Sequence, residues 1–225
     1  MYRTRFMKID IITLFPKMFE GPFRESIIKR AQEKSLVEIK IHDLRKWGIG
    51  KHRQVDDRPF GGGVGMLLMV EPIYKALKEL KVKKQESEKV KVILLSPQGG
   101  VFAQKKAKEL SKLDRLVLIA GRYEGFDSRI REHLIDEEIS IGNYVLTGGE
   151  LPAMIITDTI VRLIPGVLKK ADATKLESHS KIGYTEHPQY TRPEKFKNWS
   201  VPKVLLSGNH AKIESWKIKK TKNKP

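Results

Sequence analysis

The sequence contains no cysteine, and this absence excludes disulfide bonds, thiolate metal sites and a cysteine nucleophile. Long apolar runs are also missing, so no segment is expected to span a membrane. The first residues, Met1 to Phe6, are basic but include no apolar stretch, so they do not resemble a secretory signal. We therefore expect a cytoplasmic protein without a membrane partner.

Acidic residues are scarce relative to basic ones: 27 Asp and Glu stand against 44 Lys and Arg, which gives a net charge of +17. The segment from Lys169 to Pro225 holds 14 basic and 5 acidic residues, a net of +9. Lysine and arginine displace the counterions condensed on phosphates, so this excess favours a nucleic acid as partner. A lysine-rich surface that keeps the protein soluble would have the same composition.

The length of 225 residues and the 40% share of hydrophobic residues are enough for a globular fold with a substantial core. Apolar patterns predict strands at 8–14, 37–42, 90–95, 115–120 and 138–141. They predict helices at 22–34, 71–80, 104–110, 127–133 and 151–164, and a long loop at 43–65. Alternating strands and helices indicate an α/β fold with a mostly parallel sheet.

The character of the sequence changes near Gly166, where the chain becomes polar and then basic. We predict a main domain at 1–166, a flexible linker at 167–183 and a small basic module, mainly helical, at 184–225. No internal repeat is visible.

Three glycine-bearing segments each follow a predicted strand: Ser96 to Gly100, Gly121 to Gly125, and Gly142 to Glu150. In a parallel sheet such loops lie together at the carboxyl ends of the strands, where open α/β sheets bind their ligands. Glycine lets the backbone approach a flat or charged ligand closely. Three ordinary tight turns are the simpler alternative, but their common edge favours a cofactor site.

A fourth glycine-rich segment, Gly61 to Met66, lacks the Lys-Ser/Thr ending of a phosphate-binding loop, and no strand leads into it. It also lacks the dinucleotide-binding pattern. A flexible binding loop and a plain surface excursion explain its spacing equally well.

Several short segments, in this order and spacing, resemble the bacterial tRNA (guanine-N1)-methyltransferases, which belong to the SPOUT class of knotted methyltransferases. The resemblance extends from about residue 7 to residue 216. The matching segments are Asp10 to Pro16, Asp57 to Met66, Leu95 to Gly99, Gly121 to Gly125, Ser140 to Leu146, Gly148 to Ala153, Arg162 to Leu168, Tyr190 to Pro193, and Leu205 to His210.

The resemblance implies a C-terminal trefoil knot in the sheet domain, an exception to the usual unknotted topology. It implies that S-adenosylmethionine binds in this knot and that the enzyme is a homodimer with active sites at the subunit interface. The substrate would be tRNA, recognised through its anticodon stem-loop and methylated at guanine 37, immediately 3′ of the anticodon. DNA is not an expected partner. Mg²⁺ is associated with the reaction of this family, although no residue cluster here predicts a metal site.

By the same resemblance, the cofactor contacts are assigned to the three glycine loops and their flanks. Glu124 would meet the sulfonium or amino group, and Tyr123 and Tyr144 would contact the adenosine or methionine part; core packing is the alternative for both tyrosines. The predicted cofactor-binding residues are Leu95, Ser96, Pro97, Gln98, Gly121, Tyr123, Glu124, Ile141, Gly142, Asn143, Tyr144, Val145, Leu146, Gly148, Gly149 and Pro152.

Methylation of guanine N1 needs a base for the N1 proton and a donor for the charge that grows on O6. The resemblance gives Arg162 as the O6 donor and Glu177, where the family often has Asp, as the base. Asp158 would orient Arg162. The alternatives are a helix pair between Asp158 and Arg162, which are four residues apart, and a solvated surface charge at Glu177.

The sequence departs from the family at four places. Asn143 replaces a usual Asp, His179 a usual Phe, Met1 to Phe6 precede the usual start, and the C-terminal module ends early, which would weaken its grip on tRNA. These departures leave open a non-catalytic RNA-binding protein on a SPOUT scaffold. A nucleotide-binding enzyme that uses Gly61 to Gly65 is a second alternative, which the missing phosphate-binding lysine disfavours.

Overall fold

The computed structural model describes residues 6–82, 89–170, 173–175 and 177–223, and it divides the chain into two units, Met1–Lys169 and Lys170–Pro225. The boundary lies within the segment 167–183 that the sequence predicts as a linker. The flexibility of that segment and a binding role for residues 184–225 stay predictions. Within the described ranges, no helix is both long and apolar enough to cross a membrane.

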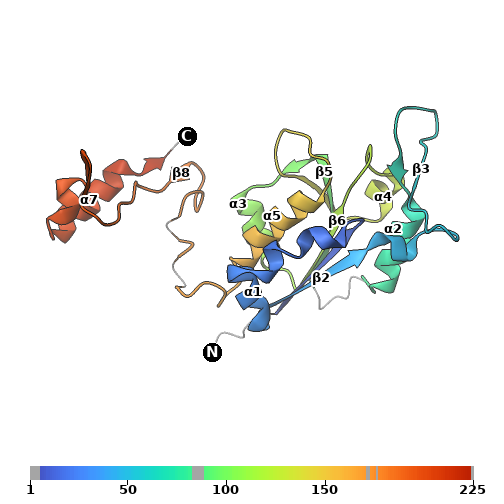
Figure 1. Ribbon diagram of the computed structural model, residues 1–225, viewed down its shortest axis with the longest axis horizontal. Coiled ribbons are helices and arrows are strands. Elements are labelled where there is room, and N and C mark those ends of the chain that lie inside the picture. The colour runs from blue at the N-terminus through green and yellow to red at the C-terminus, as the bar shows by residue number, and fades with distance from the viewer. Residues whose placement is uncertain (1–5, 83–88, 171–172, 176, 224–225) are drawn as a thin grey trace. The chain divides into compact units, whose positions relative to one another are not determined.

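A five-stranded parallel sheet forms the centre of the first unit (Figure 1). Its strands, in spatial order, are β2 (Val37–Asp43), β1 (Met7–Thr13), β6 (Arg115–Ala120), β5 (Val90–Val101) and β7 (Glu137–Ser140). The central strand β6 is buried along its length from Leu116 to Ala120. An uninterrupted apolar run of this kind is typical of a parallel strand covered on both faces.

Helices cover both faces of this sheet, and each face has its own core (Figure 1). On one face α1 (Ser26–Glu33), α3 (Gln104–Leu110) and α5 (Glu150–Val161) pack over a core that contains Ile9 and Leu118. On the other face α2 (Val70–Glu79), α4 (Ser128–His133) and the 3-10 helix η3 (Leu44–Trp47) pack over Ile12 and Val117. The predicted α/β class with a mostly parallel sheet is therefore confirmed, and the trefoil knot stays a prediction.

Three local predictions from the sequence are wrong. The predicted helix at 22–34 is split into a 3-10 turn, η2 (Pro22–Arg24), and α1, because Glu25 adopts an extended backbone between them. The predicted loop at 43–65 includes η3 and a short strand, β3 (Asp56–Asp57), which pairs with β4 (Leu67–Leu68). Apart from these errors, a 3-10 turn, η1 (Pro16–Phe19), follows β1.

The third error concerns the end of β5, which continues through the predicted loop Ser96 to Gly100 as far as Val101. The register with β7 shifts between Leu95 and Gly100, since both residues pair with Ile139. The extra residues of β5 therefore form a β-bulge near the carboxyl edge of the sheet, and this bulge changes the direction of the strand.

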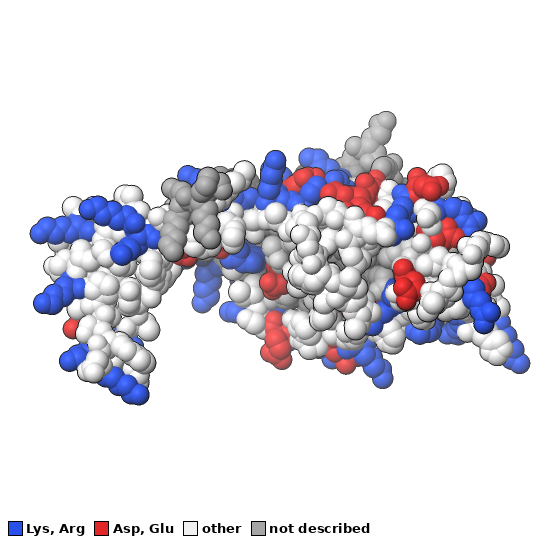
Figure 2. Space-filling view, turned by 90° about the horizontal axis from the view of Figure 1, so that it is seen from above, with Lys and Arg blue, Asp and Glu red and all other residues white. Residues whose placement is uncertain are grey.

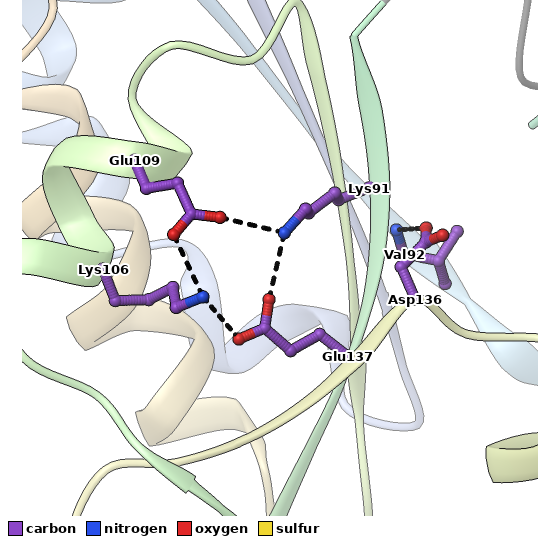
Figure 3. Close-up of polar contacts among 6 residues, drawn as sticks. All are labelled: Lys91, Val92, Lys106, Glu109, Asp136 and Glu137. Carbon is purple, nitrogen blue, oxygen red and sulfur yellow. Dashed lines mark hydrogen bonds and ion pairs between the residues drawn. The ribbon is translucent and has the colours of Figure 1, made fainter.

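At the opposite, amino edge of the sheet, four charged side chains form a closed ring of ion pairs between β5, β7 and α3 (Figure 3). Lys91 contacts Glu109 at 3.0 Å and Glu137 at 3.2 Å, and Lys106 contacts the same two carboxylates at 3.2 and 2.7 Å. Beside the ring, the Asp136 carboxylate accepts a 2.8 Å hydrogen bond from the backbone N–H of Val92. These contacts fix the start of β7 against its neighbours.

The described residues of the second unit form two helices and four very short strands. Its helices are α6 (Lys203–Leu206) and α7 (His210–Lys220), and its strands pair as β8 (Tyr184–Thr185) with β11 (Lys222–Asn223) and β9 (Lys195–Phe196) with β10 (Trp199–Ser200). The Asn209 side chain caps α7 by accepting a hydrogen bond from the N–H of Lys212. Trp216 packs near His187 and Tyr190, with ring centroids 6.4 and 6.3 Å away, and this aromatic cluster holds α7 to the loop after β8.

Candidate functional site

A cavity opens at the carboxyl ends of β5, β6 and β7, and the loops that follow these strands form its walls. Its volume of about 190 Å³ is more than ten times the ~10–15 Å³ that one water molecule requires. Apolar side chains and backbone groups form most of the wall, with Arg122 and Glu124 as charged members. The lining residues are Leu95, Ser96, Pro97, Gly121, Arg122, Tyr123, Glu124, Gly125, Phe126, Ile139, Ser140, Ile141, Tyr144, Val145, Leu146, Thr147, Gly148, Gly149 and Pro152.

The structure brings almost all of the predicted cofactor residues to this one cavity. The exceptions are Gln98, Gly142 and Asn143, which belong to the same loops but lie outside the lining. Arg122, Gly125, Phe126, Ile139, Ser140 and Thr147 line the cavity although sequence reasoning did not select them. Four of these are sequence neighbours of a selected residue: Arg122, Gly125, Ser140 and Thr147. Phe126 and Ile139 lie two positions from the nearest selected residue, just outside the motif segments.

Direct backbone contact joins the loop after β6 to the start of α5. The N–H of Gly149 donates to the carbonyl of Gly121 at 2.8 Å. A Cβ atom at Gly149 would lie only 2.6 Å from the backbone nitrogen of Gly121, closer than side chains approach. Glycine at this position therefore lets two walls of the cavity touch.

An ion pair beneath the cavity ties three segments together. The Nε of Arg122 donates to the buried carboxylate of Glu150 at 2.9 Å, and Nη1 of Arg122 donates to the carbonyl of Thr147 at 2.9 Å. The second carboxylate oxygen of Glu150 accepts from the hydroxyl of Thr13 at 2.8 Å. The Arg122 guanidinium also lies 4.5 Å from the centre of the Phe15 ring. A buried charge needs such partners, so the pair fixes the loop after β6 against α5 and the end of β1.

The end of the glycine-rich segment Gly61 to Met66 contacts Glu124, one of the residues that line the cavity. The N–H of Glu124 donates to the carbonyl of Met66 at 3.0 Å. Gly65 adopts φ +88°, and a Cβ there would lie 2.4 Å from the Cγ of Glu124. Residues 61–65 are exposed and do not line the cavity, so both interpretations of this segment, a flexible binding loop and a surface excursion, stay open.

Tyr123 occupies the left-handed region with φ +61°, which turns the chain sharply at the cavity wall. Burial raises the pKa of the Tyr123 phenol, and the carboxylate of Asp56 adds to this increase through its charge and as a hydrogen-bond acceptor. The phenol is therefore a neutral hydrogen-bond donor at physiological pH, and it connects β3 to the cavity.

Arg162 and Asp158 lie at the far end of α5 from the cavity. The N–H of Arg162 donates to the carbonyl of Asp158 at 3.2 Å, and Arg162 is the residue that follows the last turn. Since α5 has 12 residues, its two ends are about 18 Å apart. The first turn of α5 lies at the cavity wall. Within one chain, the structure therefore does not bring Arg162, at the other end of the helix, to the cavity.

Glu177 belongs to the second unit, in a hydrogen-bonded turn. Its carbonyl accepts from the N–H of Ser180 at 3.0 Å, and the neighbouring Ser178 hydroxyl accepts from the N–H of Glu186 at 3.0 Å. The Ser178 side chain thus helps to fix this turn, and Glu177 is partly buried. In the part of the chain that the structure describes, no group of three or more His, Asp or Glu residues could hold a metal ion.

The first unit is an open parallel α/β sheet with a cavity outside the carboxyl ends of its strands, the place where such sheets generally bind their ligands. The family model described as tRNA (Guanine-1)-methyltransferase TrmD matches residues 7–225 of this chain. The chain belongs to this family.

Curated relatives in distant bacteria agree with the family assignment. A tRNA (guanine-N(1)-)-methyltransferase of Dehalococcoides mccartyi is 54% identical over 215 residues, which are 96% of this chain and 86% of the relative. Enzymes of the same name from Staphylococcus carnosus and Dictyoglomus turgidum are each 55% identical, over 94% and 97% of this chain and 84% and 86% of their own lengths.

Proposed function

We propose that this protein transfers a methyl group from S-adenosylmethionine to N1 of guanine 37 in tRNA, immediately 3′ of the anticodon. The observation that carries the proposal is the cavity at the carboxyl ends of β5, β6 and β7, whose walls consist of the segments that resemble the family. The names of the relatives support the reaction, and the cavity supports a cofactor site beside it. We expect the protein to act on tRNA in the cytoplasm.

The cavity residues fit the chemical groups of S-adenosylmethionine. Leu95, Ile139 and Val145 offer apolar walls for the adenine ring, and the loop backbones offer donors and acceptors for its edge. The carboxylate of Glu124 is a partner for a sulfonium or an ammonium group. When bound, the cofactor supplies the electrophilic methyl group.

The chain's own residues supply the proton transfer. We assign Glu177 as the base that accepts the N1 proton of guanine and Arg162 as the donor that stabilises the charge growing on O6. Asp158, one helical turn before Arg162, would orient the guanidinium. In the alternative, Asp158 and Arg162 are only a helix pair, and an Asp158→Asn variant that transfers methyl groups at the parental rate would support it.

The distance along α5 supports a homodimer. Because the two ends of α5 are about 18 Å apart and its first turn lies at the cavity, an Arg162 that acts at the reaction centre would have to come from a second copy. A complete site would then combine the cavity of one subunit with Arg162 of the other. A stable and fully active monomer in light scattering would refute this assembly.

The basic residues of the second unit suit the tRNA substrate. In Figure 2 this unit, at the left, shows much Lys and Arg surface and little Asp or Glu. We assign to it the phosphate contacts that hold the anticodon stem-loop, with residues 167–183 as the flexible connection. Mg²⁺ dependence is carried over from the family as an expectation, to be tested by chelation and readdition.

The decisive experiment measures transfer of labelled methyl groups to a tRNA transcript with G37 and to the same transcript with A37. We expect incorporation only into the G37 transcript, and competition by S-adenosylhomocysteine. Binding of the tRNA without any methyl transfer would instead support the non-catalytic RNA-binding alternative. Calorimetry with ATP tests the nucleotide-binding alternative, which needs ATP to bind in preference to S-adenosylmethionine.

A further inference from the structure

The hairpin β9–β10 of the second unit exposes two aromatic rings side by side. Phe196 and Trp199 are directly paired across the hairpin, so their side chains project from the same face. The two rings are 5.8 Å apart at an angle of 47°, and the residues remain 55% and 69% exposed. Single exposed aromatic residues are common, but an adjacent exposed pair at the tip of a hairpin favours a binding surface.

The backbone fixes this pair in place. Only Lys197 and Asn198 connect the two strands, and Lys197 takes up the turn with φ +53°. The N–H of Val201 donates to the carbonyl of Glu194 at 2.9 Å and closes the hairpin below the rings. The two rings are thus presented on a short, hydrogen-bonded support.

Positive charge surrounds the rings. Lys195 and Lys197 flank Phe196 in the sequence, and the Nζ of Lys197 lies 5.7 Å from the centre of the Phe196 ring. Arg192 and Lys203 lie on either side of the hairpin in the chain, and Glu194 is the acidic residue between them. A partner for this surface must therefore combine negative charge with flat apolar groups.

We propose that Phe196 and Trp199 form a stacking platform for an unpaired nucleotide of the RNA substrate, with Lys195 and Lys197 contacting the flanking phosphates. An unpaired nucleotide combines a flat base with a charged backbone, whereas a duplex presents phosphates and keeps its bases stacked internally. A second copy of this chain would bring the same basic hairpin face to face with itself, and like charges would repel. The inference rests on the proposed function and adds to it the part of the RNA that the second unit contacts.

The test compares two RNAs across a set of variants of the full chain. The RNAs are an anticodon stem-loop and a fully paired duplex of the same length. The variants are Trp199→Leu, which keeps an apolar side chain but removes the aromatic face, Trp199→Phe, which keeps a ring, and Ile218→Ala, which changes another exposed apolar residue of the unit. Phe196→Leu repeats the test on the second ring.

We expect Trp199→Leu and Phe196→Leu to weaken binding of the stem-loop by roughly 5- to 150-fold, the equivalent of about 1–3 kcal/mol of base stacking. Trp199→Phe should lose much less, and Ile218→Ala should bind like the parent. The duplex should bind all variants equally. The stem-loop, but not the duplex, should quench a tryptophan signal that disappears in Trp199→Phe.

If the parent and both leucine variants bind the stem-loop equally, the stacking platform is wrong. Methyl transfer by the parent would in that case leave the proposed function intact. A parent that neither binds nor methylates the RNA would overturn both. If the leucine variants instead change the oligomeric state at unchanged RNA affinity, the rings form a contact between copies and the inference is wrong.

Discussion

The guanidinium of Arg122 lies 2.9 Å from the carboxylate of Glu150, whose side chain is only 1% exposed. This pair joins the loop after β6 to the first turn of α5, directly beneath the cavity. The contact between Gly149 and Gly121 joins the same two segments through the backbone. The cavity therefore depends on a buried charge pair for its shape.

Arg122→Ala should destabilise the protein by about 3–5 kcal/mol, because it leaves the Glu150 carboxylate buried with only the Thr13 hydroxyl as a described side-chain donor. Arg122→Lys should recover part of the loss, since it restores the charge but not the same geometry. The free energy of unfolding from urea titrations measures both effects. The matched control is Arg129→Ala, which removes an exposed pair with Asp127 and should change little. Equal losses for the two alanine variants would contradict the prediction.

A second buried carboxylate should give the fold an acid-sensitive contribution. Burial alone would raise the pKa of Asp10, but the hydrogen bond from His42 at 2.6 Å and the charge and hydrogen bond of Arg115 outweigh it, so the pKa lies below its usual value. Because its pKa is lowered in the folded state, Asp10 stabilises the fold at pH values above the unfolded-state pKa, near 3.8. This stabilisation is lost as the pH falls through the folded-state pKa.

Asp10→Asn should therefore lower stability at neutral pH and flatten the fall in stability below about pH 4. Urea unfolding of parent and variant as a function of pH provides the measurement. Asp127→Asn is the control. The pKa of this partly exposed carboxyl is also lowered, chiefly by the side-chain hydrogen bond from Arg129, but Asp127 is less buried than Asp10. If Asp10→Asn and the parent lose stability in parallel, Asp10 does not contribute to the acid transition.

The ring of Lys91, Lys106, Glu109 and Glu137 should behave differently from these buried pairs. The hydrogen bond to Glu137 is the largest of the effects that raise the pKa of Lys106, yet all four side chains are partly exposed. Glu137→Gln should thus cost less than about 1 kcal/mol, and the difference should shrink at high salt. Unfolding at low and high ionic strength tests this, and a large loss that salt does not change would contradict it.

The course of the chain through the first unit was largely predictable because its signals are local. β6 at 115–120 and α3 at 104–110 have the predicted bounds, since each is a clear apolar pattern between polar residues. The continuation of β5 through Pro97 and Gly99 was not predictable, because its pairing with β7 is a tertiary contact that overrides local breakers. The short strand β3 likewise exists only through its pairing with β4.

The candidate site shows the same division. The glycine loops are visible in the sequence, and their common edge follows from parallel strands. The contacts that Glu150 makes with Arg122 and Thr13 are not visible in the sequence, because Thr13 and Glu150 are 137 positions apart. The assignments of Arg162, Asp158 and Glu177 come from the family resemblance and stay predictions.

The role of Glu177 can be tested by two substitutions that differ in one property. Glu177→Gln keeps the volume and the hydrogen-bonding capacity but cannot accept the N1 proton, so single-turnover methyl transfer should fall roughly 10²- to 10⁴-fold, with cofactor binding little changed. Glu177→Asp keeps a carboxylate on a side chain one methylene shorter, and it restores the residue type common in the family. It should retain far more activity than the Gln variant.

The comparison between the two variants separates chemistry from structure. A purely structural role in the turn with Ser180 should make both substitutions behave alike, because neither changes the backbone hydrogen bond. Glu214→Gln removes an exposed carboxylate of the same unit and should leave the single-turnover rate unchanged. The pH dependence gives an independent measure, since a carboxylate base makes the rate of the parent fall at acid pH, and the Gln variant should lose that limb. If the Gln and Asp variants both transfer methyl groups at the parental rate, the N1 proton leaves through another group, and Asp158→Asn becomes the next variant to measure.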